Sequence, residues 1–235
     1  MSQRQAYEKE LKELRDQVIL MAAKTEDAIQ NSLVALVQKD RELAEEVIRR
    51  DDELDELCQS IEHRCVMLVA RQQPVAGDLR DITANMKLVT DLERIGDHGE
   101  DICVHLKRIW KNPDIEIPPT VMTLGNNSRA MLSAAVDAYI AGRPELAKAV
   151  LYMDSEIDRL YIEIKDHLIQ KIQEKPEDAP ALVELLFICK HLERAADHAQ
   201  NVAEWILYHL QGVIVEEEKS QENPVDSEDP SIAEV

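Results

Sequence analysis

The sequence is poor in aromatic side chains, which make up 3% of its 235 residues. β-Sandwiches and β-barrels are typically rich in aromatic and β-branched residues, so this scarcity disfavours those folds. Glycine is also rare, with six residues in all, and there is no glycine-rich phosphate loop, GxSxG turn or HExxH motif. Because catalytic groups commonly lie on loops, the sequence predicts a protein that is not an enzyme.

Positive charge is scarce as well. There are 27 Lys and Arg residues against 47 Asp and Glu, giving a net charge of -20. Such a protein repels the phosphates of nucleic acids and the anionic lipids of a membrane, so neither is expected as a direct partner. No apolar run reaches the roughly 18 residues of a membrane-spanning helix, and the polar opening segment MSQRQAYEKE does not resemble a signal peptide. We expect a cytoplasmic protein.

The cysteines are few and do not form a CxxC pair. Isolated cysteines in a cytoplasmic protein most often behave as small apolar core residues. We therefore expect buried free thiols at the four positions Cys58, Cys65, Cys103 and Cys189.

The residues that are abundant favour helices. Hydrophobic residues make up 45% of the chain, with Leu, Ile and Ala prominent beside many Glu residues. Nine prolines interrupt the chain, and proline is excluded from helix interiors. The uninterrupted stretches predict six long helices, at 3–38, 41–72, 76–111, 119–141, 144–174 and 179–211.

Two segments carry the same motif one hundred residues apart. Residues 91–101 read DLERIGDHGED and residues 191–201 read HLERAADHAQN, so both contain Leu-Glu-Arg-x-x-Asp-His. Residues 47–55 match residues 150–158 in the same way, with an offset of 103. Apolar residues near the motif follow a 4-3 spacing typical of a helix bundle: Leu88, Leu92, Ile95, Gly99, Ile102, Leu106 and Ile109.

The repeat predicts an all-α fold of two pseudo-symmetric three-helix bundles. The first repeat is expected at residues 1–112 and the second at 113–215. Residues 216–235 hold eight acidic residues, one lysine and two prolines, which is typical of a disordered acidic tail.

Carboxylates recur in both motifs at positions that share one helix face. Glu93, Asp97 and Asp101 are spaced four residues apart, on the side of the helix away from the apolar seam. Like charges at this spacing repel one another, and a bound cation would remove the repulsion. Oxygen ligands suit Mg²⁺, Mn²⁺ or Ca²⁺, and iron is also compatible. The alternative is a solvated acidic face that holds no metal.

The second copy supplies a similar set of candidate metal ligands at Glu193, Asp197 and Asn201. Neighbouring helices could add two further carboxylate pairs, Asp51 with Asp55 and Asp154 with Asp158. Beside the motifs, His98 and His198 are expected to form hydrogen bonds between helices rather than to bind metal.

Arg94 and Arg194 follow the two motif glutamates directly. They either pair with acidic residues on adjacent helices or contact a protein partner, and the sequence leaves both possibilities open.

Two three-helix repeats, each with Leu-Glu-Arg-x-x-Asp-His, resemble the PhoU family of bacterial regulators of phosphate transport and signalling. The segment from Gln73 to Arg80 is also similar to the family's loop before the third helix, which makes Arg80 a candidate partner contact. The resemblance covers about residues 5–212. It implies two pseudo-symmetric bundles, often dimeric, with metal motifs at Glu93, Asp97, Asp101, Glu193 and Asp197. Mg, Mn, Fe or no metal would be compatible with the family.

The resemblance also implies a negative regulator of phosphate uptake and of phosphate-starvation signalling. Such a protein would bridge the ATPase of a phosphate ABC transporter and a membrane sensor histidine kinase. Its attachment to the membrane would depend on these proteins, because its charge opposes lipid binding.

Three other functions are compatible with the sequence. A metal-dependent phosphohydrolase or metal store would use the two carboxylate stripes. A purely structural helical scaffold would have no phosphate phenotype. A histidine phosphotransfer domain would need an exposed phosphorylatable histidine, for which His98 and His198 are poor candidates.

Overall fold

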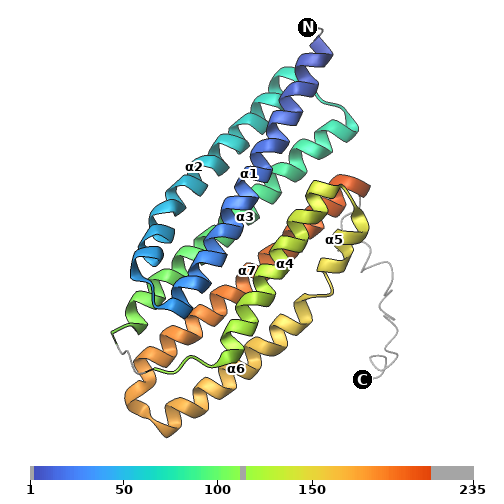
Figure 1. Ribbon diagram of the computed structural model, residues 1–235. Helices are drawn as coiled ribbons and strands as arrows, with labels where there is room; N and C mark the ends of the chain where they lie inside the picture. Colours follow the sequence, from blue (N-terminus) through green and yellow to red (C-terminus); the bar gives the residue numbers. More distant parts are fainter. Residues whose placement is uncertain (1–2, 112–114, 213–235) are drawn as a thin grey trace, which may run out of the picture.

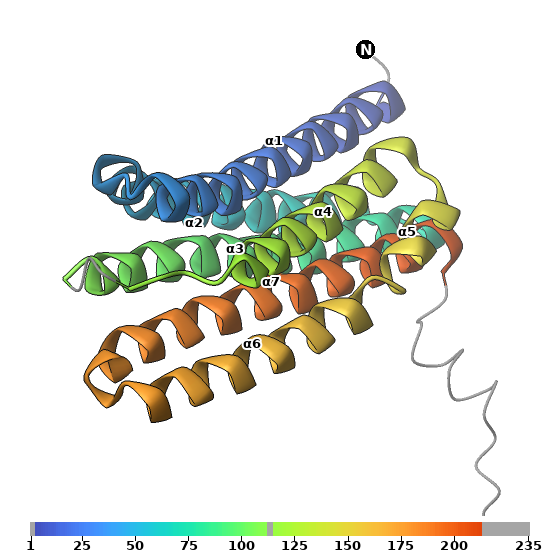
Figure 2. The same ribbon diagram turned by 60° about the horizontal axis from the view of Figure 1, so that its bottom comes forward.

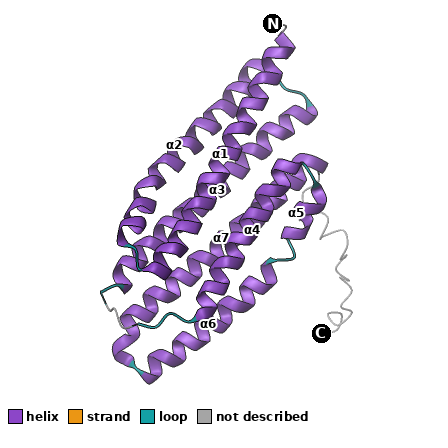
Figure 3. Ribbon diagram, viewed as in Figure 1, coloured by secondary structure: helices purple, strands orange, loops and turns teal. Residues whose placement is uncertain are grey.

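The structure is a computed structural model that describes residues 3–111 and 115–212. In this part of the chain all regular structure is helical (Figure 3). The all-α prediction is therefore confirmed. The elements in chain order are α1 (Gln3–Gln38), α2 (Arg41–Gln72), α3 (Ala76–Ile109), α4 (Pro119–Ala141), α5 (Pro144–Val150), α6 (Asp154–Glu174), the 3-10 turn η1 (Pro176–Asp178) and α7 (Ala179–Gln211).

Local sequence signals explain most helix ends. Asp40 caps α2, because its side chain accepts a hydrogen bond from the Leu43 N–H over 3.0 Å. Pro119 occupies the first turn of α4, where no backbone N–H donor is required. Gly142 and Gly212 directly follow α4 and α7 and end them, with φ angles of 62° and 75° in the left-handed region that glycine adopts without a steric cost.

The two repeats lie side by side with α3 and α7 at their junction (Figure 1). α1, α2 and α3 form one bundle, and α4 to α7 form the other. The most extensive packing in the molecule is that of α3 on α7, which are the third helices of their repeats. Figure 2 shows α1 and α2 on one side of this central pair and α6 on the other. The motif helices of both repeats are therefore central, and their polar residues meet neighbouring helices.

The expected continuous helix at 144–174 is wrong in one place. α5 ends at Val150 and α6 begins at Asp154. Between them the N–H groups of Tyr152 and Met153 donate to carbonyls three residues earlier, so the chain turns more tightly than an α-helix. The matching stretch of the first repeat, Val47–Asp55, remains inside the unbroken helix α2. The two repeats thus differ in the helix that supplies the neighbouring carboxylates.

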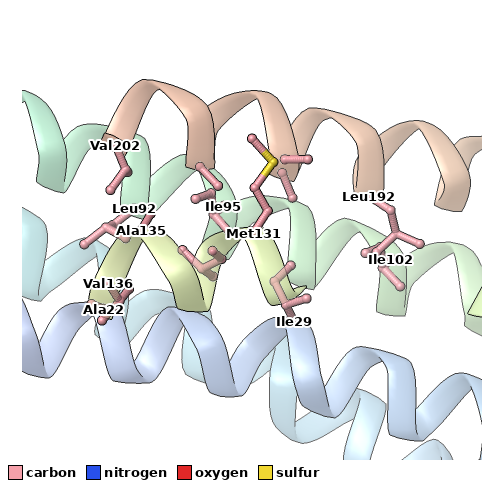
Figure 4. Packing of buried hydrophobic residues seen from close by; sticks show 14 of the residues in the cluster. Ala22, Ile29, Leu92, Ile95, Ile102, Met131, Ala135, Val136, Leu192 and Val202 are labelled. Atoms are coloured by element: carbon pink, nitrogen blue, oxygen red, sulfur yellow. The ribbon is translucent and has the colours of Figure 1, made fainter. Parts of the chain in front are cut away.

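A single apolar core joins the two repeats. Figure 4 shows side chains from α1, α3, α4 and α7 meeting in it. Fully buried examples, one or two from each helix, are Ile29, Leu92, Ile102, Met131 and Leu192. Burial of a large aliphatic side chain contributes about 1.5–3 kcal/mol, so this core is the main source of attraction between the repeats.

The cysteine prediction is confirmed. The four thiols are buried and none forms a disulfide. No helix in the described residues is both long enough and apolar enough to cross a membrane.

Candidate functional site

The first motif lies where α3 approaches α2 closely. Gly96 of α3 makes this approach possible, because a Cβ at its position would come within 2.6 Å of Leu54 Cδ1 in α2. The face of α3 that carries Glu93 and Asp97 is therefore covered by α2 and half-buried rather than open to solvent.

This packing brings together carboxylates that are far apart in the sequence. Asp51 and Asp55 from α2 meet Asp97 from α3, and each offers an oxygen within 4.8 Å of the other two. The structure thus joins one of the expected neighbouring pairs with the central residue of the first stripe.

The electrostatics of the cluster show excess negative charge. Burial, together with the nearby carboxylates of Glu100, Asp97 and Asp55, raises the pKa of Asp51 to about 7. Burial likewise raises the pKa values of Asp97 and Glu93. Because these carboxyl groups resist ionisation, a bound cation would stabilise their charged form.

Arg94 only partly relieves this charge. Its guanidinium lies 3.0 Å from Asp97 Oδ2 and 3.4 Å from Glu93 Oε2, two acids of its own helix. Of the two possibilities for Arg94, the described residues do not show pairing with acids of adjacent helices, because both acids that it contacts belong to α3. Glu93 Oε2 is buried and accepts no hydrogen bond. The donor set of Asp51, Asp55 and Asp97 fits a hard divalent cation of the Mg²⁺ or Mn²⁺ type.

The second repeat arranges its acids differently. Glu193 is bound by Lys190, whose Nζ lies 2.5 and 2.6 Å from the two carboxylate oxygens. The first repeat has Thr90 at the position of Lys190, so it lacks this internal cation.

Asp197 still lies close to other acids. Burial, together with the carboxylates of Glu193, Asp154 and Asp158, raises its pKa to about 6. In the described residues these acids do not bring three oxygens within 4.8 Å of one another, whereas those of the first repeat do.

Asn201 does not join the acids of the second repeat. Its amide faces α3 and donates to Asp91 Oδ1 over 3.1 Å. The same carboxylate accepts from His198 Nδ1 at 2.8 Å and from Trp205 Nε1 at 3.0 Å. His198 therefore bonds between helices, as expected, and Asn201 is part of the junction between the repeats.

Asp101 also turns away from its stripe and toward α7. Its Oδ2 lies 3.4 Å from His191 Nδ1, which in turn lies 3.3 Å from His98 Nδ1. Burial, together with the nearby His191 and His198, lowers the pKa of His98 to about 3. His98 is thus a neutral imidazole at pH 7.

The two other arginines occupy different environments. Arg80 reaches across the junction, where its Nε donates to the carbonyl of His209 over 3.1 Å. Arg194 is exposed on α7. Both remain predicted partner contacts, and Arg194 is the more accessible of the two.

Sequence reasoning missed several residues of these clusters, among them Glu100, His191 and His105. Glu100 acts on Asp51, and His105 lies next to His191 with its Nδ1 2.6 Å from Glu184 Oε2. The repeat held a usable signal, because His191 occupies the position of Asp91 and His105 that of Trp205.

Comparison with known proteins identifies the fold. The PhoU domain matches the chain twice, at residues 18–105 and 121–206. The chain belongs to the PhoU family. Both PhoU matches contain a Leu-Glu-Arg-x-x-Asp-His motif and the carboxylate pair that precedes it.

Curated PhoU homologues span nearly the whole chain. The phosphate-specific transport system accessory protein PhoU homolog of Aquifex aeolicus is 37% identical over 91% of this chain and 97% of that protein. The homolog of Clostridium acetobutylicum is 35% identical over 89% and 96%. The PhoU protein of Escherichia coli K12 is 28% identical over 88% and 86%.

Solved PhoU structures share the arrangement of the helices. PhoU from Pseudomonas aeruginosa superposes with a TM-score of 0.85 at 29% identity, covering 88% of this chain and 100% of that one. PhoU from Streptococcus pneumoniae gives a TM-score of 0.83 at 28% identity, with coverages of 88% and 98%. The resemblance that the repeated motif indicated is thereby confirmed over both bundles.

Proposed function

We propose that this PhoU-family protein is an accessory regulator of a phosphate-specific transport system and lowers phosphate uptake when phosphate is plentiful. The observation that carries the proposal is the pair of PhoU matches, one in each bundle. Full-length relatives that bear the name of transport accessory protein support it.

The finer proposal is a bridge between two membrane-bound partners. One is the ATPase of the phosphate ABC transporter, and the other is a sensor histidine kinase that the protein holds inactive. Long helices and a net charge of -20 suit a protein that presents large polar surfaces to other proteins. Such partners would place the protein at the cytoplasmic face of the membrane. A homodimer is part of this proposal, and light scattering on the purified full chain would test it.

The proposed role is not enzymatic, and metal at the carboxylates would serve structure or regulation. Asp51, Asp55 and Asp97 are the ligands we propose for Mg²⁺, Mn²⁺ or iron, with Glu93 and Glu100 adjacent. Asp154, Asp158, Glu193 and Asp197 form a weaker candidate, because Lys190 already neutralises Glu193.

The decisive experiment is a phosphate-starvation reporter in a strain that lacks this gene, grown in high phosphate. We expect the reporter to be switched on and the intact gene to switch it off again. A reporter that stays off in the deletion strain would contradict the repressor role.

Variants of the same gene test the partner contacts. Arg194→Ala and Arg94→Ala should leave the reporter switched on, because exposed arginines commonly anchor protein interfaces. Arg159→Ala is the matched control, since this exposed arginine pairs with Glu156 and Glu163 on its own helix. Co-purification of each variant with the transporter ATPase and with the kinase would show which contact is lost.

The metal is tested separately. Asp51→Asn together with Asp97→Asn should abolish the thermal stabilisation of the full chain by Mn²⁺, whereas Asp166→Asn, at an exposed position on α6, should not. Equal stabilisation of both proteins would exclude the α2–α3 cluster as the binding site.

A further inference from the structure

The junction between α3 and α7 contains two contacts that the repeat makes equivalent. One pairs a carboxylate with a histidine, and the other pairs two histidines. An offset of 100 residues relates position 91 to 191 and position 98 to 198. The contact of residue 91 with residue 198 therefore has a counterpart in that of residue 191 with residue 98. The structure shows both, at 2.8 Å and 3.3 Å between the closest polar atoms.

The first contact is a saturated hydrogen-bond network. The carboxylate of Asp91 accepts from His198, Asn201 and Trp205. One anion thus meets three N–H donors, and no further ligand is needed to balance it.

The counterpart brings together two imidazoles and a carboxylate instead of one carboxylate and three donors. Here the central residue is His191, and it faces His98 and Asp101. His98 is 7% exposed and its Nε2 has no hydrogen-bond partner, so its polar contact in this cluster is made through Nδ1. Each of the three residues can offer a lone pair, whereas the equivalent site pairs one acceptor with three donors.

The spacing of these groups matches a metal-binding site. One nitrogen or oxygen from each of the three residues lies within 4.8 Å of the others. His191 Nδ1 lies 3.3 Å from His98 Nδ1 and 3.4 Å from Asp101 Oδ2. Ligands bound tetrahedrally at the usual 2.0–2.1 Å from Zn²⁺ are separated by about 3.3–3.4 Å.

We propose that His98, Asp101 and His191 bind a divalent transition-metal ion of the Zn²⁺ class. Two imidazoles and one carboxylate leave a fourth position open to water, as in zinc sites with three protein ligands. Imidazole selects such ions over Mg²⁺ and Mn²⁺, which prefer oxygen. Asp101 has a half-exposed side chain, so the ion can enter from solvent on that side.

This site is separate from the α2–α3 carboxylates and joins different parts of the molecule. His98 and Asp101 belong to the first repeat and His191 to the second. A bound ion would hold the two bundles together at their main contact. Its presence does not depend on the proposed role in phosphate transport.

The test uses the full chain, stripped of metal with a chelator and kept in excess Mg²⁺ to fill the carboxylate cluster. Co²⁺ is the probe, because its visible absorption reports imidazole ligands and four-coordinate geometry. We expect one equivalent of Co²⁺ to develop this absorption and Zn²⁺ to displace it. His191→Asn and Asp101→Asn should each weaken Co²⁺ binding by at least about tenfold, since even residues that only support ligands change metal affinity that much.

Two controls make the result specific. Asp166→Asn removes an exposed carboxylate of α6, outside both metal clusters, and should leave Co²⁺ binding unchanged. His63→Gln removes an exposed histidine of α2 and should also have no effect. Asp101→Asn changes a half-exposed position, so it keeps the test valid if His191→Asn does not fold. Absence of Co²⁺ absorption in the unaltered protein, or equal binding by Asp101→Asn, would overturn the proposal.

Discussion

The indole Nε1 of Trp205 in α7 donates a hydrogen bond to Asp91 Oδ2 in α3 over 3.0 Å. This bond joins the two repeats through residues 114 positions apart in the sequence. The Asp91 carboxylate also accepts hydrogen bonds from His198 and Asn201. A single side chain of the first repeat thus binds three donors of the second.

Replacing that carboxylate should therefore destabilise the whole molecule. We expect Asp91→Ala to lower the free energy of unfolding by about 2–3 kcal/mol, because its three donors lose a charged acceptor in a partly buried interface. Urea denaturation of the full chain measures the change. Asp166→Ala, at an exposed position, should stay within about 0.5 kcal/mol of the unaltered protein. Equal stability of the two variants would mean that the Asp91 network does not hold the repeats together.

Gly99 tests the close approach of α3 to α1. A Cβ at this position would lie 3.2 Å from both the backbone carbon and the Cβ of Ala28, and the backbone cannot rotate aside. Gly99→Val should therefore cost about 1–3 kcal/mol of stability through overpacking.

Gly77, in the first turn of the same helix, is the matched control. A Cβ there would have no neighbour within 4 Å. Gly77→Ala should stabilise the protein by about 0.4–1 kcal/mol, because alanine restricts the unfolded chain. Thermal unfolding of both variants measures the difference, and a neutral Gly99→Val would contradict the tight packing of α1 on α3.

Asp51 should make the stability of the metal-free protein depend on pH. Its pKa is about 7 in the folded state against an ordinary value of 3.8. Because the pKa of Asp51 is raised in the folded state, its contribution to the free energy of unfolding is fully present below pH 3.8. This contribution is lost as the pH rises through 7. Asp51→Asn should therefore lose less stability than the unaltered protein between pH 4 and pH 8.

Chemical denaturation in the presence of a chelator, at several pH values, checks this expectation. Asp52→Asn changes the adjacent exposed residue and serves as the control. Parallel pH profiles for the unaltered protein and Asp51→Asn would show that the Asp51 carboxyl is not held neutral.

Lys190 explains why the second acidic group differs from the first. Substituting Lys190→Thr copies the residue found at position 90 and frees both oxygens of Glu193. The excess negative charge then favours a divalent cation, so we expect additional Mn²⁺ to bind. Counting bound Mn²⁺ by electron paramagnetic resonance measures this gain. Lys171→Thr makes the same charge change at an exposed site of α6, and an equal gain there would point to a general charge effect.

The thiols should be inert in the folded protein. Burial raises the pKa values of Cys58, Cys65, Cys103 and Cys189 to about 12, and the thiolate is the reactive form. A chromogenic disulfide reagent should react with them only after a denaturant is added. Rapid reaction of one thiol without denaturant would show that its helix opens locally.

Much of the fold could be predicted because its signals are local. Asp40 caps a helix, Pro119 begins one and Gly142 ends one, and each acts through its own backbone neighbours. The break between α5 and α6 carries no such signal. Residues 151–153 contain neither proline nor glycine, so the sequence predicted one continuous helix over 144–174.

The candidate sites were predicted only in part. Spacing along a helix places Glu93, Asp97 and Asp101 on one face, but it does not say which helix covers that face. In the packed structure Asp97 faces α2 and Asp101 faces α7. Asn201 bonds to Asp91 and lies apart from the acids around Asp197.

The sequence by itself determined the helical class, the two repeats and the membership of the PhoU family, because each depends on residue type and spacing along one segment. Only the tertiary structure decided which side chains meet. Asp51 reaches Asp97, and His98 reaches His191, through the packing of long helices that bring distant segments together. That packing depends on the shapes of the buried surfaces, such as the approach at Gly96, rather than on the pattern of any single helix.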